Sequence, residues 1–397
     1  MVCALGLTQT LAWASSTYLP AILAAPIARD LGISRATVFG AFSVSLLVMA
    51  ATGPLVGRAI DRAGGRHMLM YSNLVLAAGL AMLGAASHVA MLFAAWCILG
   101  AGMAMGLYDA AFAALVRIYG TDARKPITGI TLIAGFASTV GWPLSAFMDA
   151  HIGWRGACFV WAGLHLLIAL PMNWRLIPAV AVAPPAPAKG APAEGKDGPL
   201  VATPAEARSR RRSYAWLAVY FATTAFVTSA YASHLPGLLS AMGAGAAGAV
   251  LAAALLGPAQ VAARLVEFGV ISRYRVHALT TARVATALHP LACLILGVFG
   301  GPLGFAAAFA LLHGAGNGMI TIAKGTLPLA LFGAAGYGLT QGWLGVGARL
   351  MQATAPYAFG LVLDLWGGRA ALAISAGLSL LALGSLFLLR ARPDADH

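Results

Sequence analysis

Residues 57–66 read Gly-Arg-Ala-Ile-Asp-Arg-Ala-Gly-Gly-Arg, a short charged segment between two long apolar runs at 37–57 and 67–86. Each run has about the 20 residues that an α-helix needs to cross the hydrocarbon core of a bilayer. A charged loop between two such runs is typical of a membrane protein, in which the chain crosses, turns in water and crosses back.

The same pattern continues over the whole chain of 397 residues and predicts twelve membrane-spanning helices. The predicted spans are 2–27, 37–57, 67–86, 89–115, 126–147, 153–176, 214–239, 246–265, 279–299, 302–323, 338–363 and 370–389. Only 9% of the residues are charged and 60% are apolar, whereas a soluble domain carries roughly 25% charged residues. This composition excludes a cytosolic enzyme, a disordered protein and a secreted disulfide scaffold. The expected fold class is an all-α membrane protein.

One segment between the sixth and seventh spans differs from the rest of the chain. Residues 179–213 are rich in Pro, Ala and Lys and end in a cluster of arginines. Such a segment buries too little apolar area to fold, so it is predicted to be a flexible linker. It divides the chain into an N-terminal six-helix bundle at 1–178 and a C-terminal six-helix bundle at 214–397.

The basic residues predict the orientation of the chain. Nineteen of the 25 Lys and Arg residues lie in or beside loops on one side of the predicted membrane, and four lie on the other side. Because cytoplasmic loops collect Lys and Arg, the linker and both termini are expected in the cytoplasm. The net charge of +13 therefore reflects topology and does not indicate a nucleic-acid partner. A cell membrane, and a bacterial inner membrane in particular, is the expected location.

The two predicted bundles repeat short motifs in the same order. Tyr18-Leu19-Pro20 corresponds to His234-Leu235-Pro236, at an offset of 216 residues. In the same way, Gly53-Pro54 followed by Arg58 and Asp61 corresponds to Gly257-Pro258 followed by Arg264 and Glu267. Such a parallel repeat has its axis along the membrane normal, and transporters built this way bind substrate near the midplane between the halves.

The loop at 57–66 resembles the signature between helices 2 and 3 of the major facilitator superfamily. Asp61, Arg62, Gly64 and Arg66 match that signature, and Gly65 stands where many members have a second basic residue. The resemblance implies a cytoplasmic latch, in which Asp61, Arg62 and Arg66 help to stabilise the outward-facing state. The Asp-Arg-x-Gly-x-Arg form is similar to the monocarboxylate and oxalate:formate porters, although the aromatic-rich helix 1 signature of monocarboxylate porters is absent.

Arg349 is the clearest ionisable residue inside a predicted span. It lies eleven positions after Gly338, which places it roughly 16 Å into a core about 30 Å thick. Charged side chains at such depth are costly and mark functional sites. A guanidinium can bind a carboxylate through two parallel hydrogen bonds, so Arg349 is a candidate substrate ligand. The alternative is an internal ion pair that only holds helices together.

Arg264 allows two interpretations. It follows Gln260 by one helical turn, and monocarboxylate porters are similar here, with an acidic residue and an arginine at this spacing in helix 8. That resemblance implies a substrate site at Arg264 and Gln260, with Gln260 replacing the acid. The internal repeat instead pairs Arg264 and Glu267 with Arg58 and Asp61, which makes them a second latch. Both interpretations stay open at this point.

Asp109 lies toward the cytoplasmic end of its predicted span. The resemblance implies an ion pair with a loop arginine, Arg66 or Arg62, and the alternative is a protonatable coupling group. His313 is a further candidate because Asn317 follows it by one turn. A histidine in a span can carry a coupled proton, but it can also be a hydrogen-bonded packing residue.

Residues of the first and seventh spans complete the predicted site. If helices 1 and 7 face the cavity, as the family resemblance implies, it is lined by Gln9, Trp13, Tyr18 and Tyr231. His234, also on the seventh span, is a further candidate as a titratable histidine. Packing or an interfacial belt is the alternative for the aromatic residues.

The sequence as a whole predicts a secondary active transporter of a small organic anion, such as a carboxylate, that works by alternating access with a coupled proton or by exchange. No cofactor, metal, enzymatic activity or nucleic-acid partner is expected, and the chain is expected to act as a monomer. There is no Gly-x-x-x-x-Gly-Lys-Ser/Thr phosphate loop for ATP. The alternatives are an exporter of drugs or amphipathic solutes by proton antiport, and a non-transporting membrane receptor or membrane-embedded enzyme.

Overall fold

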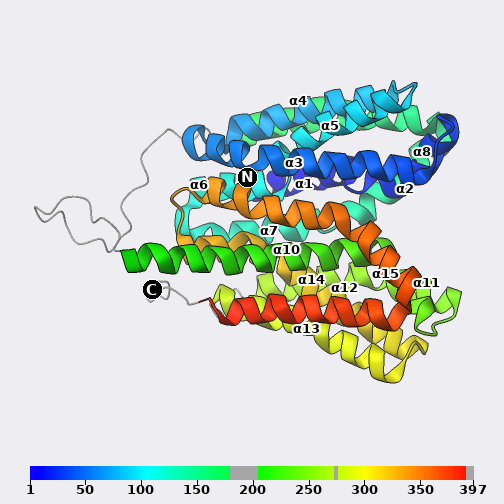
Figure 1. Cartoon of the computed structure of the whole chain (residues 1–397). Coiled ribbons are helices and arrows are strands. Elements are labelled where there is room, and N and C mark those ends of the chain that lie inside the picture. Colours follow the sequence, from blue (N-terminus) through cyan, green and yellow to red (C-terminus); the bar gives the residue numbers. More distant parts are fainter. Residues whose placement is uncertain (179–203, 272–275, 390–397) are drawn as a thin grey trace, which may run out of the picture.

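The computed structural model describes residues 1–178, 204–271 and 276–389. The described residues fold into helices that run roughly alongside one another, and none of them forms a strand (Figure 1). The helices before residue 178 are α1 (Val2–Ser15), α2 (Leu19–Asp30), α3 (Arg35–Ala63), α4 (Gly65–Gly84), α5 (Val89–Gly106), α6 (Tyr108–Tyr119), α7 (Arg124–Ala134), α8 (Ala137–Leu164) and α9 (Leu170–Leu176). A 3₁₀ turn, η1 (Gly120–Ala123), and a π-helical turn, η2 (His165–Ala169), lie between them.

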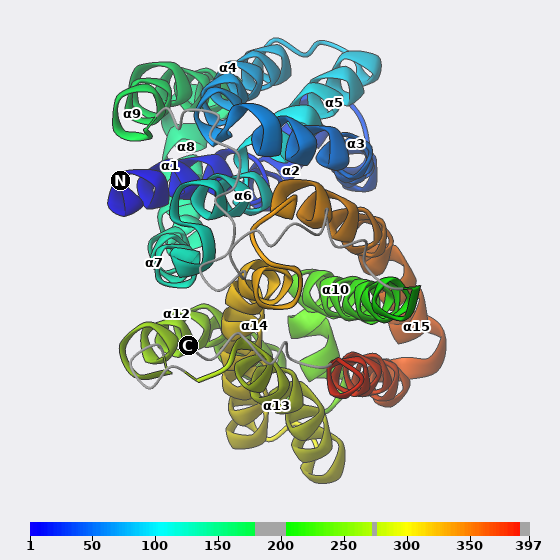
Figure 2. The same ribbon diagram turned by 90° about the vertical axis from the view of Figure 1, so that its left-hand side faces the viewer.

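The helices after residue 204 form the other side of the molecule in both views (Figure 2). They are α10 (Pro204–Ala241), α11 (Ala246–Ala254), α12 (Leu256–Val266), the π-helical turn η3 (Glu267–Ile271), α13 (Ala278–Phe299), α14 (Leu303–Phe332) and α15 (Tyr337–Phe387). One large apolar core is made almost wholly by residues before 178, and two smaller cores are made by residues after 214. Each side of the molecule therefore buries its own apolar surface.

Nine helical segments of the described residues are long and apolar enough to cross a membrane. Two of them, Val89–Leu176 with 88 residues and Tyr337–Phe387 with 51, are far longer than the about 20 residues that one crossing needs. They contain three and two of the predicted spans, respectively. Within them, Gly153 and Gly367 take φ values of 73° and 77°, which are not helical. Glycine adopts these angles without steric cost, so the chain can turn at both points.

The helix α10 begins earlier than the sequence predicts. Residues 204–213, part of the predicted linker, form its first turns. Ala, Glu and Arg are good helix formers, which favours a helix here. The remainder of the predicted linker, 179–203, lies outside the described residues.

Several predicted spans are broken inside. The run 2–27 is interrupted at Ser16–Tyr18, and the run 89–115 at Leu107, whose backbone is extended (φ −85°, ψ −171°). The run 246–265 is divided between α11 and α12 at Leu255, whose backbone stays near helical values (φ −72°, ψ −15°). Hydropathy does not register such breaks, because the residues on both sides are equally apolar. Broken helices at membrane depth occur where the freed backbone groups line a cavity or find partners inside the protein.

The two sides of the molecule meet most closely between α3 and α15 (Figure 2). Gly53 and Gly57 of α3 face Gly342 and Gly338 of α15, and a Cβ added to Gly342 would lie 2.6 Å from the carbonyl oxygen of Gly53. Only glycine allows backbones to approach this closely, as in small-residue contacts between membrane helices. We call this contact the glycine seam.

Candidate functional site

The break at Leu107 positions Asp109 in the first turn of α6. A carboxylate at a helix N-terminus is stabilised by the free N–H groups and the helix dipole there. The carbonyl of Gly106, which the break leaves without a helical partner, accepts a hydrogen bond from Nε2 of Gln9 at 2.5 Å. Gln9, predicted to line the cavity, is instead buried, with only 1% of it exposed. Its hydrogen bond from α1 stabilises the break between α5 and α6.

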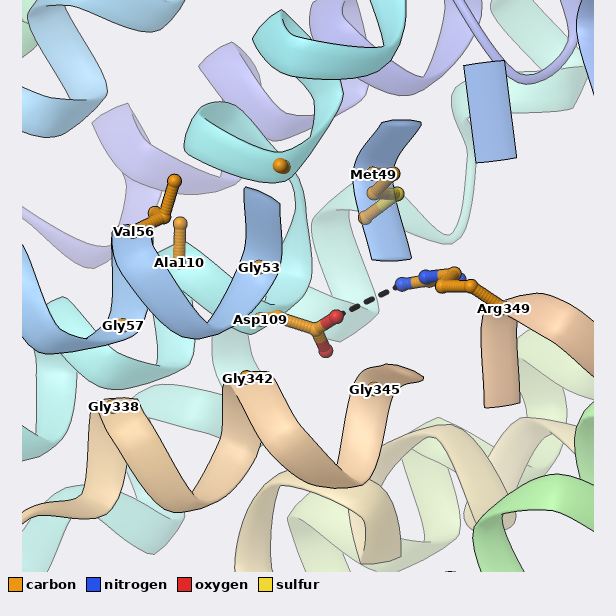
Figure 3. A pocket seen from close by; sticks show the side chains of 11 residues that line it. Met49, Gly53, Val56, Gly57, Asp109, Ala110, Gly338, Gly342, Gly345 and Arg349 are labelled. Carbon is orange, nitrogen blue, oxygen red and sulfur yellow. Dashed lines mark hydrogen bonds and ion pairs between the residues drawn. The ribbon is translucent and has the colours of Figure 1, made fainter. Parts of the chain in front are cut away.

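Asp109 forms an ion pair with Arg349 across the two sides of the molecule. Nη2 of Arg349 lies 3.0 Å from Oδ2 of Asp109, and Figure 3 shows the two side chains pointing toward one another from α15 and α6. Both side chains are largely buried, with 14% of Arg349 and 27% of Asp109 exposed. The pairing of Asp109 with Arg66 or Arg62 that the family resemblance implied is therefore wrong. α6 directs this carboxylate toward α15 rather than toward the loop at 57–66.

Two glutamine side chains complete this ion pair. Gln352 accepts a hydrogen bond of 2.7 Å from Nη1 of Arg349, and Gln341 donates one of 3.2 Å to Oδ1 of Asp109. The Gln341 amide also donates to the backbone carbonyl of Lys324 at 3.3 Å. Neither glutamine is among the predicted site residues, although a polar amide within an apolar span is itself a signal of a partner inside the protein.

A small cavity lies beside the ion pair (Figure 3). It is lined by Asp109 and Arg349, by Met49 of α3 and by the glycines of the glycine seam. Its volume, about 20 Å³ for the centres of water molecules, is room for about one water. This space is too small for an organic substrate, so the arrangement of helices seen here is closed at this point.

Arg264 is buried where α12, α14 and α7 meet. It is 5% exposed, and its Nε and Nη1 atoms donate to the backbone carbonyls of Gly318 and Thr131 at 3.4 and 3.2 Å. In the part of the chain that the structure describes, no carboxylate lies within ion-pair distance of it. The backbone of Gln260 packs directly against Gly318.

Glu267 joins the two sides through a second ion pair. Its carboxylate, 1% exposed, lies 2.9 Å from Nη2 of Arg124 at the start of α7, and Arg124 also donates to the carbonyl of Val276. Arg264 and Glu267 are thus neighbours with different surroundings. Glu267 has the cross-molecule contact expected of a latch, and Arg264 is a buried cation among backbone carbonyls.

Asp61 binds the N-terminus of α15. Its two carboxylate oxygens accept hydrogen bonds from the backbone N–H groups of Gly338 and Leu339, both at 2.8 Å. These N–H groups belong to the first turn of α15 and have no acceptor within the helix. Arg62 is exposed and Arg66 is half-buried, so within this loop the hydrogen bonds to α15 come from the acid.

The predicted aromatic residues form one cluster on the N-terminal side. The Trp13 ring lies 4.9 Å from that of Tyr108 and 6.1 Å from that of Tyr18, between ring centroids. His234 of α10 is hydrogen-bonded to α15, with its Nε2 2.7 Å from the carbonyl oxygen of Pro356. Asn317 accepts a hydrogen bond of 2.7 Å from Thr228.

The sequence profile of the Major Facilitator Superfamily matches residues 5–320 of this chain. The chain belongs to the Major Facilitator Superfamily. It is an integral membrane transporter and not an enzyme, and membership in this family favours transport over the receptor alternative.

Two relatives of this superfamily transporter match part of the chain. Monocarboxylate transporter 3 of Rattus norvegicus is 28% identical over 142 residues, which is 35% of this chain and 28% of the relative. The oxalate:formate antiporter of Oxalobacter formigenes is 30% identical over 151 residues, 38% of this chain and 35% of the relative. The matched segments thus span about a third of the length of these relatives.

Solved structures show the same fold over nearly the whole length. The human organic anion transporter MFSD10 (TETRAN) has a TM-score of 0.68 at 18% identity, and covers 97% of this chain and 98% of its own. The fucose:proton symporter FucP of E. coli has a TM-score of 0.72 at 16% identity, with 98% of both chains covered.

Proposed function

We propose that this superfamily transporter carries a small organic anion, a carboxylate, which binds between its two halves at Arg264 and Arg349. The observation that carries the proposal is the buried guanidinium of Arg264, which has backbone carbonyls but no described carboxylate beside it. A buried charge without a counter-charge is strongly unfavourable. An anionic substrate supplies the missing charge.

The charges near Arg349 support the same substrate class. Arg349 and Lys324 bring two cations to the region of the single carboxylate of Asp109, which Gln341 links to the Lys324 backbone. Lys324 has no ion-pair partner among the residues that the structure describes. The region therefore has an excess of positive charge, which stabilises a bound anion more than a neutral or cationic solute.

Asp109 acts in this proposal as an internal competitor of the substrate. With no substrate bound, its carboxylate holds the guanidinium of Arg349. A substrate carboxylate can replace it, because both form the same charge-assisted hydrogen bonds with a guanidinium. Since Asp109 and Arg349 belong to opposite halves, this exchange also removes one of the contacts that hold the halves together.

The architecture that fits this function has twelve spans in two six-helix bundles, 1–178 and 214–397, related by a parallel repeat. Two contacts support the repeat. Asp61 binds the start of α15, and Glu267, its counterpart in the repeat, binds Arg124 at the start of α7. Each half thus sends an acid from equivalent loops to an equivalent helix of the other half.

The orientation follows from the basic residues, which place the linker and both termini in the cytoplasm of a bacterial cell. Asp61, Arg124 and Glu267 lie at helix ends on that side, and they join the halves there. We therefore assign the structure to a state closed toward the cytoplasm. Transport as a monomer, by opening of these contacts and rocking of the two halves, is the expected mechanism.

Uptake into proteoliposomes tests the proposal, with radiolabelled lactate and oxalate as probes. Arg264→Gln is expected to weaken binding of the transported probe about 10- to 150-fold, since a hydrogen bond to a charged group contributes roughly 1.5–3 kcal/mol. Arg155→Gln is the matched control, because Arg155 pairs with exposed Asp30 within one half. If neither probe moves or competes, or if Arg264→Gln transports normally, the proposal is wrong.

A second candidate function is export of amphipathic solutes by proton antiport. The ion pair between Asp109 and Arg349 favours it, because Arg349 would then be structural and Asp109 would be the coupling acid. The same proteoliposomes distinguish the two functions. An exporter would release a preloaded lipophilic cation in response to a pH gradient, and carboxylates would not compete.

A further inference from the structure

The core of the C-terminal half contains two histidines in direct contact. The rings of His289 on α13 and His313 on α14 have centroids 4.6 Å apart, and the ring of Tyr231 on α10 packs against both, at 5.1 and 4.7 Å. All three residues are at most 4% exposed. We call the two histidines the histidine pair.

The hydrogen bonds of the histidine pair are incomplete. Among the residues that the structure describes, Nδ1 of His289 and Nδ1 of His313 are both buried and have no hydrogen-bond partner. Nε2 of His289 lies 3.4 Å from the thiol of Cys293. Buried polar groups are nearly always hydrogen-bonded, so two orphaned ring nitrogens in one contact require an explanation.

A third buried histidine shows what a structural histidine looks like in this protein. His165, in the π-helical turn η2, is fully buried, and both of its ring nitrogens are occupied. Nε2 lies 2.8 Å from the hydroxyl of Ser15 and Nδ1 lies 2.9 Å from Oδ1 of Asn73. The histidine pair lacks such partners, which leaves it free to bind a proton.

The charges around the histidine pair are few. Tyr231 of α10 and Cys293 of α13 are the titratable neighbours, Ser375 of α15 bonds to both, and α11 contains no titratable residue. Cations on the elements around the pair include Arg264 of α12, which reaches α14 at Gly318, and Arg283 of α13, which donates to the carbonyl of Leu386. Gly318 lies five residues after His313, roughly 7.5 Å along the helix at 1.5 Å per residue.

We propose that the histidine pair holds one proton that crosses the membrane together with the anion. The inference rests on the proposed function, because the anion controls the proton. Without substrate, the positive charge of Arg264 and the dry surroundings oppose protonation. A carboxylate bound at Arg264 cancels that charge, so a proton from the external water forms an N–H bond at a free Nδ1 of the pair.

The contact limits the pair to a single proton. Two imidazolium rings at this separation repel strongly, so the pair takes up one proton as a unit. One carboxylate and one proton then cross together without net charge, and the proton is released to the internal water when the anion leaves. By linkage, the anion and the proton must strengthen each other's binding equally.

The experiment compares two modes of transport in proteoliposomes with lactate and oxalate as probes. One mode is net uptake driven by an inward proton gradient, and the other is exchange of labelled for unlabelled probe at equal pH. His289→Gln and His313→Gln are expected to reduce gradient-driven uptake at least tenfold and to leave exchange within twofold. His151→Gln, an exposed histidine, is the matched control and is expected to change neither mode.

Asp109→Asn separates the histidine pair from the other coupling candidate. It is expected to keep the response to the proton gradient, although its apparent affinity for the anion rises. The inference is overturned if Asp109→Asn loses that response while the histidine variants keep it. It is also overturned if the histidine variants lose both modes equally while remaining monodisperse in detergent, because the pair is then a packing element. If the unaltered protein exchanges a probe but ignores the gradient, the inference fails and the proposed function stands.

Discussion

Replacement of Asp61 by asparagine tests how strongly its contact with α15 holds the two sides of the molecule together. Both carboxylate oxygens of Asp61 accept a backbone N–H of α15 at 2.8 Å. Asparagine has one oxygen and one amide nitrogen in the same space, so one N–H of α15 would face another donor. The substitution keeps the shape of the side chain and removes one acceptor together with the charge.

The size of the effect follows from two contributions. A hydrogen bond to a charged group contributes roughly 1.5–3 kcal/mol, and a carboxylate at a helix N-terminus contributes about 0.3–1 kcal/mol more. Asp61 is only partly buried, so the lower part of this sum, about 2 kcal/mol, applies. At about 1.4 kcal/mol per factor of ten, the state in which this contact is open gains roughly 30-fold in population.

Cysteine labelling measures this population. Val56 is 8% exposed and lines the cavity beside the glycine seam, so Val56→Cys reacts with a bulky maleimide only when the halves separate. With the native cysteines replaced, Asp61→Asn is expected to raise the labelling rate in inside-out vesicles about 30-fold, as long as the open state stays a minority. Asp30→Asn, in an exposed ion pair within one half, is the control and leaves the rate unchanged. A rise of less than threefold with Asp61→Asn would refute the reasoning.

Three further substitutions test other contacts. Glu267→Gln removes the buried partner of Arg124 and should raise Val56→Cys labelling 5- to 150-fold, at about 1–3 kcal/mol; an unchanged rate would show that this pair does not hold the halves. Gly342→Ala puts a Cβ 2.6 Å from the Gly53 carbonyl, so overpacking of about 1–3 kcal/mol should open the same side, whereas Gly377→Ala, with open space around it, should not. His165→Ala should lower the free energy of unfolding by about 2–4 kcal/mol, seen as a lower Tm in detergent, and an unchanged Tm would contradict a structural role.

Composition and hydropathy were enough to predict an all-helical membrane protein, because those signals depend only on the local sequence. The segment at 57–66 identified the family for the same reason, since its acid and glycines are adjacent in the chain. Of the two glycines that interrupt the longest helical segments, Gly367 lies between two predicted spans and Gly153 is the first residue of one. The break at Leu107 could not be predicted, because it depends on Gln9 of α1 reaching a carbonyl of α5.

The partner of Asp109 shows where reasoning from sequence reaches its limit. Asp109 and Arg349 are 240 positions apart, and their contact exists only because the glycine seam brings α15 close to the N-terminal half. The sequence identified both residues as unusual but could not bring them together. The sequence could not distinguish Arg264, buried among backbone carbonyls, from Glu267, paired with Arg124, because neighbours on a helix can face different surroundings.

The glycine seam has a consequence for the heat capacity of the transport cycle. Much of the contact is backbone against backbone, between Gly53 and Gly57 on one side and Gly338 and Gly342 on the other. Separation along it exposes little apolar side-chain area, and apolar exposure is what produces a large heat-capacity change. The enthalpy change of opening along the seam should therefore be nearly independent of temperature. The ratio of open to closed molecules then follows a straight van't Hoff line, and warming or cooling changes it smoothly.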